Sequence, residues 1–206
     1  MQDAINDFIT IWVIVDPIAA LPIFIGLTGY YSKAERHKIA LAMVLVALVV
    51  LIFFISLGQF IINAMGVSLL AFEIAGGLIL FLFAVDLVIG EQRQKVAEAG
   101  ERLSPMQRAL YPLAIPNLAG PGAMLTVMLR TDNSRFNLLE QAHTTASVAA
   151  VLAITYVLLL LADPITRTIG TGGANVLRRI MGMIIAGYAA NLVVGGIGDW
   201  LHLPPL

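Results

Sequence analysis

Paired prolines inside apolar runs are the feature that most constrains how this chain can fold. Pro17 and Pro22 lie in one apolar run, and Pro116 and Pro121 lie ninety-nine residues later in another. A proline lacks the backbone N–H and its ring clashes with the preceding turn, so it interrupts a helix. Hydrocarbon offers no replacement hydrogen bonds, so membrane helices keep such breaks only where the freed groups meet protein, water or a solute. Two breaks at matching places of two halves are typical of a transporter built from an internal repeat.

The composition indicates an integral membrane protein. The chain is 59% hydrophobic and only 12% charged, and its mean hydropathy is +0.91, whereas about 25% of the residues of a soluble domain are charged. Cysteine is absent, which excludes disulfides and thiolate metal sites. The three histidines share no ligand spacing, so we predict no metal site. A net charge of −1 gives no footprint for nucleic-acid binding.

Six stretches have roughly the 20 apolar residues that a membrane-spanning helix needs. We predict an all-α membrane protein with six transmembrane helices at Phe8–Leu27, Ile39–Ile62, Ser68–Gly90, Ala109–Leu129, Ala142–Ala162 and Ile180–Gly198. Residues 1–103 and 104–206 then hold three helices each. Because three is odd, the second half enters the membrane from the opposite face. The sequence therefore predicts one membrane domain of two inverted-topology three-helix repeats, with helices 1 and 4 broken.

A second pair of matching segments supports the repeat. At an offset of 105, five residues of the third predicted helix match five of the sixth: Gly77, Ala84, Asp86, Leu87 and Gly90 correspond to Gly182, Ala189, Asn191, Leu192 and Gly195, with Asn191 in place of an aspartate. Glycine is frequent in membrane helices, so chance remains an alternative for this match taken alone.

The placement of Lys and Arg predicts the orientation. If the N-terminus faces outward, the inner connections hold ten Lys and Arg, and the outer connections hold only Arg130 and Arg135. Cytoplasmic loops carry an excess of these residues. We therefore expect a multi-pass inner-membrane protein with both termini on the periplasmic side.

Asp16 is the first candidate binding residue. It lies roughly 12–13 Å into the first predicted helix, close to the membrane midplane, where a charged residue costs about 2.5–3.5 kcal/mol. One interpretation is a ligand for a substrate ammonium or a coupling cation, or a proton carrier. The other is an N-cap for a helix that starts at Pro17. The two are compatible, because capping a half-helix at the midplane is one way to build such a site. Pro17 and Pro22 complete this candidate segment.

The second break supplies complementary groups. Asn117, Gly120, Pro121 and Gly122 lie roughly at the same depth, entered from the opposite face. Glycines leave backbone N–H groups uncovered, and a half-helix starting after Pro121 would direct its positive end at an anion such as a carboxylate. The alternative is close helix packing through small residues. Asp86 and Asn191, which correspond in the repeat, are candidate gating residues at opposite mouths.

These residues resemble the MarC family of six-span inner-membrane proteins. The resemblance rests on Val15-Asp16-Pro17-x4-Pro22-Ile23-Phe24, on Pro112-Leu113-Ala114-Ile115-Pro116 followed by Ala119-Gly120-Pro121-Gly122, on Gly76-Gly77, and on Gly170-x2-Gly173-x-Asn175-x-Leu177-x-Arg179-x-Met181-Gly182. It implies a transporter of neutral amino acids such as alanine and glycine. The chain departs from the family at Ala19-Ala20, where relatives often have Gly-Asn, and this departure bears on specificity.

The leading prediction is a secondary transporter that holds a small zwitterion at the two breaks. Membrane lipids are the other expected partners, no cofactor is expected, and coupling to a proton or a sodium ion stays open, as does the oligomeric state. The sequence lacks the motifs of membrane hydrolases and a P-loop, so we predict that the chain is not an enzyme. The alternatives are a drug efflux protein and a non-transporting channel or sensor.

Overall fold

The computed structural model describes residues 2–89 and 104–202, and the regular structure in those ranges is helical. The elements are α1 (Gln2–Val15), α2 (Pro17–Thr28), α3 (Lys33–Ala64), α4 (Leu69–Ile89), α6 (Pro105–Arg108), η1 (Ala109–Leu118), α7 (Pro121–Arg130), α8 (Leu138–Leu160) and α9 (Ala162–Trp200). Gly90 and the charged connection 91–103, which ends the predicted first half, lie outside the described residues.

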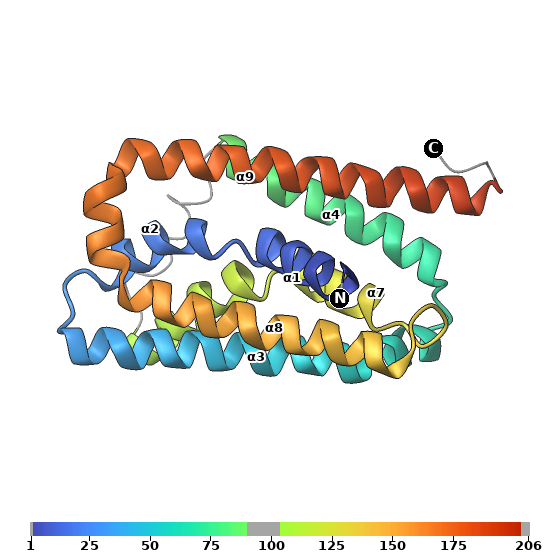
Figure 1. Cartoon of the computed structure of the whole chain (residues 1–206), viewed down its shortest axis with the longest axis horizontal. Helices are drawn as coiled ribbons and strands as arrows, with labels where there is room; N and C mark the ends of the chain where they lie inside the picture. Colours follow the sequence, from blue (N-terminus) through green and yellow to red (C-terminus); the bar gives the residue numbers. More distant parts are fainter. Residues whose placement is uncertain (1, 90–103, 203–206) are drawn as a thin grey trace.

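Two pairs of long helices enclose the interrupted ones. α4 packs along α9 and α3 packs along α8, and in Figure 1 the first pair forms the upper layer and the second the lower layer, with α1, α2 and α7 between them. α1 and α2 contact α8 and α9, whereas η1 and α7 contact α3 and α4. Each interrupted helix is therefore covered by long helices from the other half of the chain.

Four helical stretches within the described residues are long and apolar enough to cross a membrane on their own. They are Lys33–Ala64, Leu69–Ile89, Leu138–Leu160 and Arg179–Trp200. The segment Pro105–Leu118 and α7 make a fifth if they count as one span bent by 56°. α1 and α2, with 14 and 12 residues, are each too short. The structure thus bears out an all-helical membrane protein, and its described residues contain four to five candidate spans where the sequence predicts six.

The helix breaks follow the prolines. Asp16, which precedes Pro17, adopts the left-handed conformation (φ 45°, ψ 66°) and separates α1 from α2. Gly120, which precedes Pro121, is extended (φ −79°, ψ 169°) and separates η1 from α7. A proline disfavours the right-handed helical conformation of the residue before it. Pro22, by contrast, lies inside α2.

Two further interruptions lie within η1. Tyr111 (φ −136°, ψ 128°) and Ile115 (φ −122°, ψ 125°) have extended backbones. Each precedes a proline, Pro112 or Pro116, so the same steric rule accounts for both. The sequence prediction of a single break in the fourth helix therefore understated how irregular this segment is. A corner in α9 has another cause, because Gly170 takes a positive φ of 68° there.

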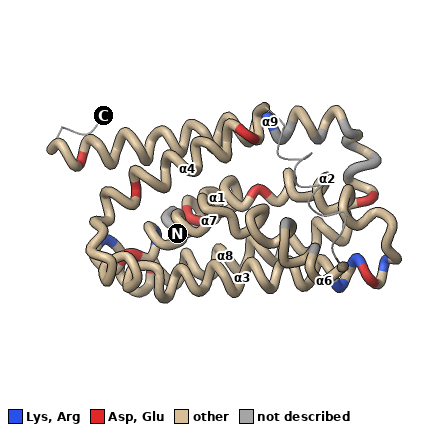
Figure 2. The backbone as a smooth tube through the Cα atoms, turned by 180° about the vertical axis from the view of Figure 1, so that it is seen from behind, with Lys and Arg blue, Asp and Glu red and all other residues tan. Residues whose placement is uncertain are grey.

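Polar caps and charges mark the ends of the bundle. Ser32 and Glu35 form a capping box at the start of α3, and Asn137 and Glu140 form one at the start of α8. Each box satisfies backbone N–H groups that the first helical turn leaves free. Figure 2 shows that most basic residues lie toward the ends of the bundle, whereas acidic residues also lie along its length.

α4 and α9 come closest at two glycines that have matching surroundings. A Cβ added at Gly77 would meet three α9 atoms: Val193 Cγ2 at 2.8 Å, Ala189 O at 3.2 Å and Leu192 Cβ at 3.2 Å. A Cβ added at Gly182 would meet three α4 atoms: Val88 Cγ2 at 2.9 Å, Ala84 O at 3.0 Å and Leu87 Cβ at 3.0 Å. Every residue in one set lies 105 positions from its counterpart in the other. The two helices thus exchange equivalent contacts between residues of the same type.

The close approach at these glycines predicts a stability difference between two positions in α9. Gly182→Ala places a Cβ against α4 and should destabilise the fold by about 1–3 kcal/mol, as overpacking does. Gly187→Ala meets nothing within 4 Å, and it should be neutral or stabilise by up to about 1 kcal/mol, since glycine weakens helices. Thermal unfolding in detergent checks both variants. Gly77→Ala should match Gly182→Ala, and equal stability of the two α9 variants would contradict the packing.

Candidate functional site

The two helix breaks lie side by side in the centre of the bundle. A Cβ added at Gly122, in the first turn of α7, would collide with Leu80 of α4 and lie 3.6 Å from Ile14 Cγ2 of α1. Ile14 is two residues before Asp16. The packing that brings α7 against α1 and α4 therefore sets the start of α7 beside the end of α1, and only a glycine fits at this contact.

Asp16 uses its two carboxylate oxygens differently. The side chain is buried, and Oδ1 accepts a hydrogen bond from the Ala19 backbone N–H at 3.3 Å. Oδ2 is buried as well and has no hydrogen-bond partner among the described residues. A buried acceptor without a partner is destabilising by about 1–3 kcal/mol. The cap and the ligand interpretations of Asp16 therefore involve different oxygens, and the second oxygen is free to bind a cation or a donor.

The second break also exposes donors that lack acceptors. Asn117 is half-buried in η1, and its Nδ2 is a buried atom without a partner among the described residues. Gly120 is the N-cap residue of α7 and has no side chain that could cap the helix. The N–H groups of Gly122 and Ala123 therefore have no acceptor within the helix. A Cβ at Gly120 would lie 2.6 Å from the carbonyl oxygen of Pro116, so this turn needs a glycine.

The other predicted residues lie around these groups or away from them. Pro17 is buried at the start of α2, Pro121 is exposed at the start of α7, and the side chain of Pro22 is outside what the structure describes. Asp86 is half-exposed on α4, and Asn191 is exposed on α9. Both gating candidates lie on the α4–α9 pair rather than on the broken helices. No group of His, Cys, Asp or Glu in the described ranges could hold a metal ion.

A buried ion pair near the N-terminus was not predicted from the sequence. The Asp7 carboxylate accepts hydrogen bonds from Arg130 Nη1 at 3.0 Å and from Thr144 Oγ1 at 2.7 Å. Asp7 and Thr144 are buried, and Arg130 is partly exposed. These residues join α1, α7 and α8 at one end of the bundle. The sequence contains one indication of this pair. Asp7 and Arg130 have opposite charges and border predicted helices on the same predicted side of the membrane.

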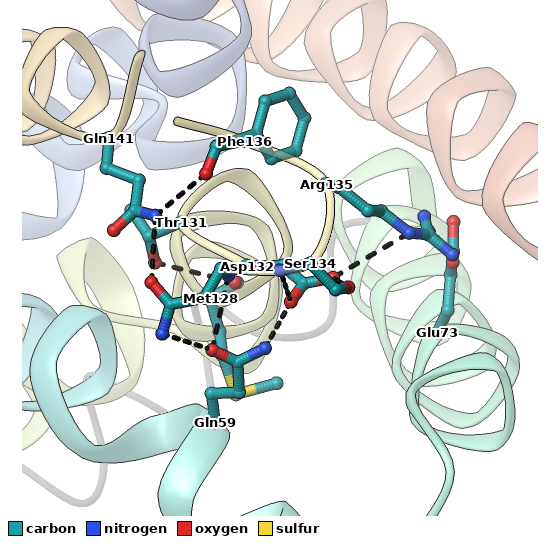
Figure 3. Close-up of polar contacts among 10 residues, drawn as sticks. Gln59, Glu73, Met128, Thr131, Asp132, Ser134, Arg135, Phe136 and Gln141 are labelled. Carbon is teal, nitrogen blue, oxygen red and sulfur yellow. Dashed lines mark hydrogen bonds and ion pairs between the residues drawn. The ribbon is translucent and has the colours of Figure 1, made fainter. Parts of the chain in front are cut away.

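A larger polar network fixes the connection between α7 and α8 (Figure 3). Fully buried Asp132 accepts hydrogen bonds from Gln59 Nε2 and from the backbone and side chain of Ser134, at 3.0 and 2.7 Å for the latter two. Arg135 bridges Asp132 and Glu73, with Nη1 3.3 Å from Glu73 Oε2 and Nε 3.8 Å from Asp132 Oδ2. The network ties this connection to α3 and α4 of the first half.

Two cavities lie at opposite ends of α3. One, of about 470 Å³, borders the polar network and is lined by Gln59, Asn63 and Thr131 among others. The other, of about 660 Å³, is lined by Phe24, Arg36 and Asp163 among others, where α2 turns into α3. Asp16 and Gly120, the residues at the two breaks, are buried.

Asp132 provides a test of the polar network. Every group that contacts its carboxylate is a donor, so Asp132→Asn would set an amide NH2 against other donors and leave one of them unsatisfied. We expect a loss of about 1–3 kcal/mol in the free energy of unfolding. Exposed Asp199→Asn is the matched control and should change stability by less than about 0.5 kcal/mol. Thermal unfolding in detergent measures both, and equal effects would contradict a structural role for this network.

The comparisons with known proteins identify the family. Residues 1–201 match the MarC family of integral membrane proteins. A UPF0056 membrane protein of Methanocaldococcus jannaschii is 36% identical over 201 residues, which cover 96% of this chain and 97% of the relative. A UPF0056 membrane protein of Aquifex aeolicus is 34% identical over 206 residues, an alignment that covers 96% of this chain and 93% of the relative. No solved structure matches the chain significantly. With a family match over almost its whole length, the chain belongs to the MarC family of integral membrane proteins.

Proposed function

We propose that this protein is a secondary transporter of small solutes, with neutral amino acids as the substrates that the family resemblance favours. The observation that carries the proposal is the meeting of two helix breaks in the centre of the bundle. Asp16 Oδ2 and Asn117 Nδ2 are buried there without partners among the described residues. Discontinuous helices that meet near the midplane are the usual binding site of transporters with inverted repeats.

The contacts between α4 and α9 support the proposed inverted repeat. The reciprocal approach of Gly77 and Gly182 supports a two-fold axis between residues 1–103 and 104–206. The packing of the broken helices agrees with it, because α1 and α2 contact α8 and α9, and α7 with η1 contacts α3 and α4. Exchange of the two halves converts one set of contacts into the other.

The same axis favours six spans. If η1 and α7 together cross the membrane, their counterpart, α1 with α2, crosses it as well. Together α1 and α2 contain 26 residues, which is enough for a span of about 30 Å at about 1.5 Å per residue. Successive elements then alternate in direction, as the colours of Figure 1 allow the reader to follow. Both termini fall on one side, which the distribution of Lys and Arg assigns to the periplasm of an inner-membrane protein.

In this proposal the breaks divide the charges of a zwitterion between them. Asp16 Oδ2 accepts the ammonium group, or a coupling proton or sodium ion. The free N–H groups of the first turn of α7 and the Asn117 amide donate to the carboxylate, where the helix dipole also favours an anion. Asp86 and Asn191 gate opposite mouths as the two halves rock. Ala19 and Ala20 are both buried and leave little polar lining on α2, which suits a small side chain.

The proposed topology has a direct test, because the chain contains no cysteine. Ala34→Cys at the start of α3 should be protected from a membrane-impermeant maleimide in intact cells. Leu201→Cys, beyond α9, should react. Both positions are exposed, so access from one side of the membrane is what differs between them. The same labelling in inside-out vesicles serves as the control, and a reversed pattern would overturn the orientation.

The proposed role of Asp16 is tested by removing its charge without its cap. Asparagine is as good an N-cap as aspartate and tolerates the left-handed conformation. Asp16→Asn should therefore stay folded but lose the charge-assisted contact, which contributes about 1.5–3 kcal/mol, so we expect roughly 10- to 100-fold weaker transport of alanine. Asp16→Ala should in addition lower stability by about 1 kcal/mol through the lost cap.

The measurement is uptake and counterflow of radiolabelled alanine, glycine and serine in proteoliposomes, with and without proton or sodium gradients. Exposed Asp199→Asn is the matched control and should transport like the parent protein. Unchanged transport by folded Asp16→Asn would remove Asp16 from the mechanism. No flux of any of the three substrates by the parent protein would overturn the amino-acid assignment.

A further inference from the structure

A cavity at the end of the bundle carries an ion pair on its wall. The cavity has a volume of about 660 Å³ and lies among α2, α3, α8 and α9. Leucines of α8 form its apolar side. The aromatic, polar and charged residues of its lining are Phe24, Lys33, Arg36, His37, Asp163 and Thr168.

Arg36 and Asp163 make an ion pair between the two halves of the chain, in which one guanidinium nitrogen contacts both carboxylate oxygens. Arg36 Nη1 lies 2.9 Å from Asp163 Oδ1 and 2.7 Å from Oδ2. The Arg36 side chain is only 13% exposed, whereas that of Asp163 is 40% exposed, so a solute in the cavity can reach the pair from the aspartate side. The guanidinium lies over the ring of Phe24, 5.6 Å from its centroid. Phe24 belongs to α2, the half-helix that begins at Asp16.

The chemistry of the pair selects the ligand. A compact molecule with both a carboxylate and an ammonium group can satisfy Arg36 and Asp163 at once when it separates them. A ligand with one charge would leave the other member of the pair without a partner, which is costly for a partly buried group. We propose that this cavity is a second binding station for small zwitterions, in which Arg36 binds the carboxylate and Asp163 the ammonium group.

The station would communicate with the central site through α2. A ligand on Arg36 changes the contact of the guanidinium with Phe24, and Phe24 is eight residues from Asp16 on the same helix. The inference rests on the proposed function in taking a zwitterion as the transported solute. It goes beyond it by naming a separate site at the end of the bundle.

Lys33 and His37 are the other ionisable groups in the described lining of the cavity, and they point to the competing ligand. His37 Nδ1 lies 2.7 Å from the carbonyl oxygen of Lys33 and is engaged there. Together with Arg36 these groups could attract a phosphate, free or in a lipid headgroup. Because Asp163 neutralises Arg36 in the structure, the zwitterion fits the pair better than an anion does.

The test uses the absence of cysteine. Thr168 is exposed and lines the cavity, so Thr168→Cys reports occupancy through its rate of alkylation by an impermeant maleimide in inside-out vesicles. We expect saturating alanine to slow this rate several-fold, and acetate and inorganic phosphate to leave it unchanged. Arg36→Gln and Asp163→Asn in the Thr168→Cys background should each abolish the protection. Lys38→Gln, an exposed charge on α3 outside the lining, should keep it.

Adding Asp16→Asn separates this proposal from the central site. Alanine should still protect Thr168→Cys when Asp16→Asn has weakened transport roughly 10- to 100-fold, which would support the station independently of flux. Transport of alanine by the parent protein without any protection would overturn the station while the proposed function stands. Protection by phosphate that Lys33→Gln removes would overturn it in favour of an anion site. Protection that survives both Arg36→Gln and Asp163→Asn would also overturn the assignment of the two ligands.

Discussion

The steric clash of four prolines with the residue before each of them controls the architecture of this protein. Pro17, Pro112, Pro116 and Pro121 break two apolar helices, and the residue before each of them leaves the right-handed helical conformation. Backbone groups freed in this way must be covered, because a bilayer offers them no partners. The two long helix pairs, α3 with α8 and α4 with α9, provide that cover. The close packing of Gly122 against Leu80 and Ile14 follows from the same need.

The parts of the fold that could be predicted from the sequence are those determined by local rules. A proline after Asp16 or Gly120 disfavours the helical conformation at that residue whatever surrounds it, so the breaks were predictable in position. The additional breaks at Tyr111 and Ile115 obey the same rule. The repeated Pro-x4-Pro spacing does not indicate the break at Tyr111, because Pro112 has no counterpart in the first break. The span count needs more than local rules, since α1 and α2 are each too short to cross a membrane alone.

Contacts between distant residues could not be predicted in the same way. Asp7 and Arg130 are 123 positions apart, and Gln59 meets Asp132 across 73 positions. Each of these side chains, taken alone, resembles a solvated residue at the end of a membrane helix. Burial turns them into structural partners, and burial depends on how α1, α3, α7 and α8 pack. The reciprocal glycines are an intermediate case, because the offset of 105 was visible but its meaning as a contact required the antiparallel packing of α4 and α9.

The positions of the ion pairs between the two halves indicate where such a structure can move. The ion pairs Asp7–Arg130, Glu73–Arg135 and Arg36–Asp163 each join residues 1–103 to residues 104–206, and each has at least one partly exposed member. Each pair also has a mostly buried member, so it separates at low cost only where water or a solute replaces the lost partner. The middle of the bundle is joined by glycines and aliphatic side chains, which lack directional bonds. Rocking of the halves would therefore exchange ion pairs at the water-facing ends and leave the apolar packing around the breaks intact.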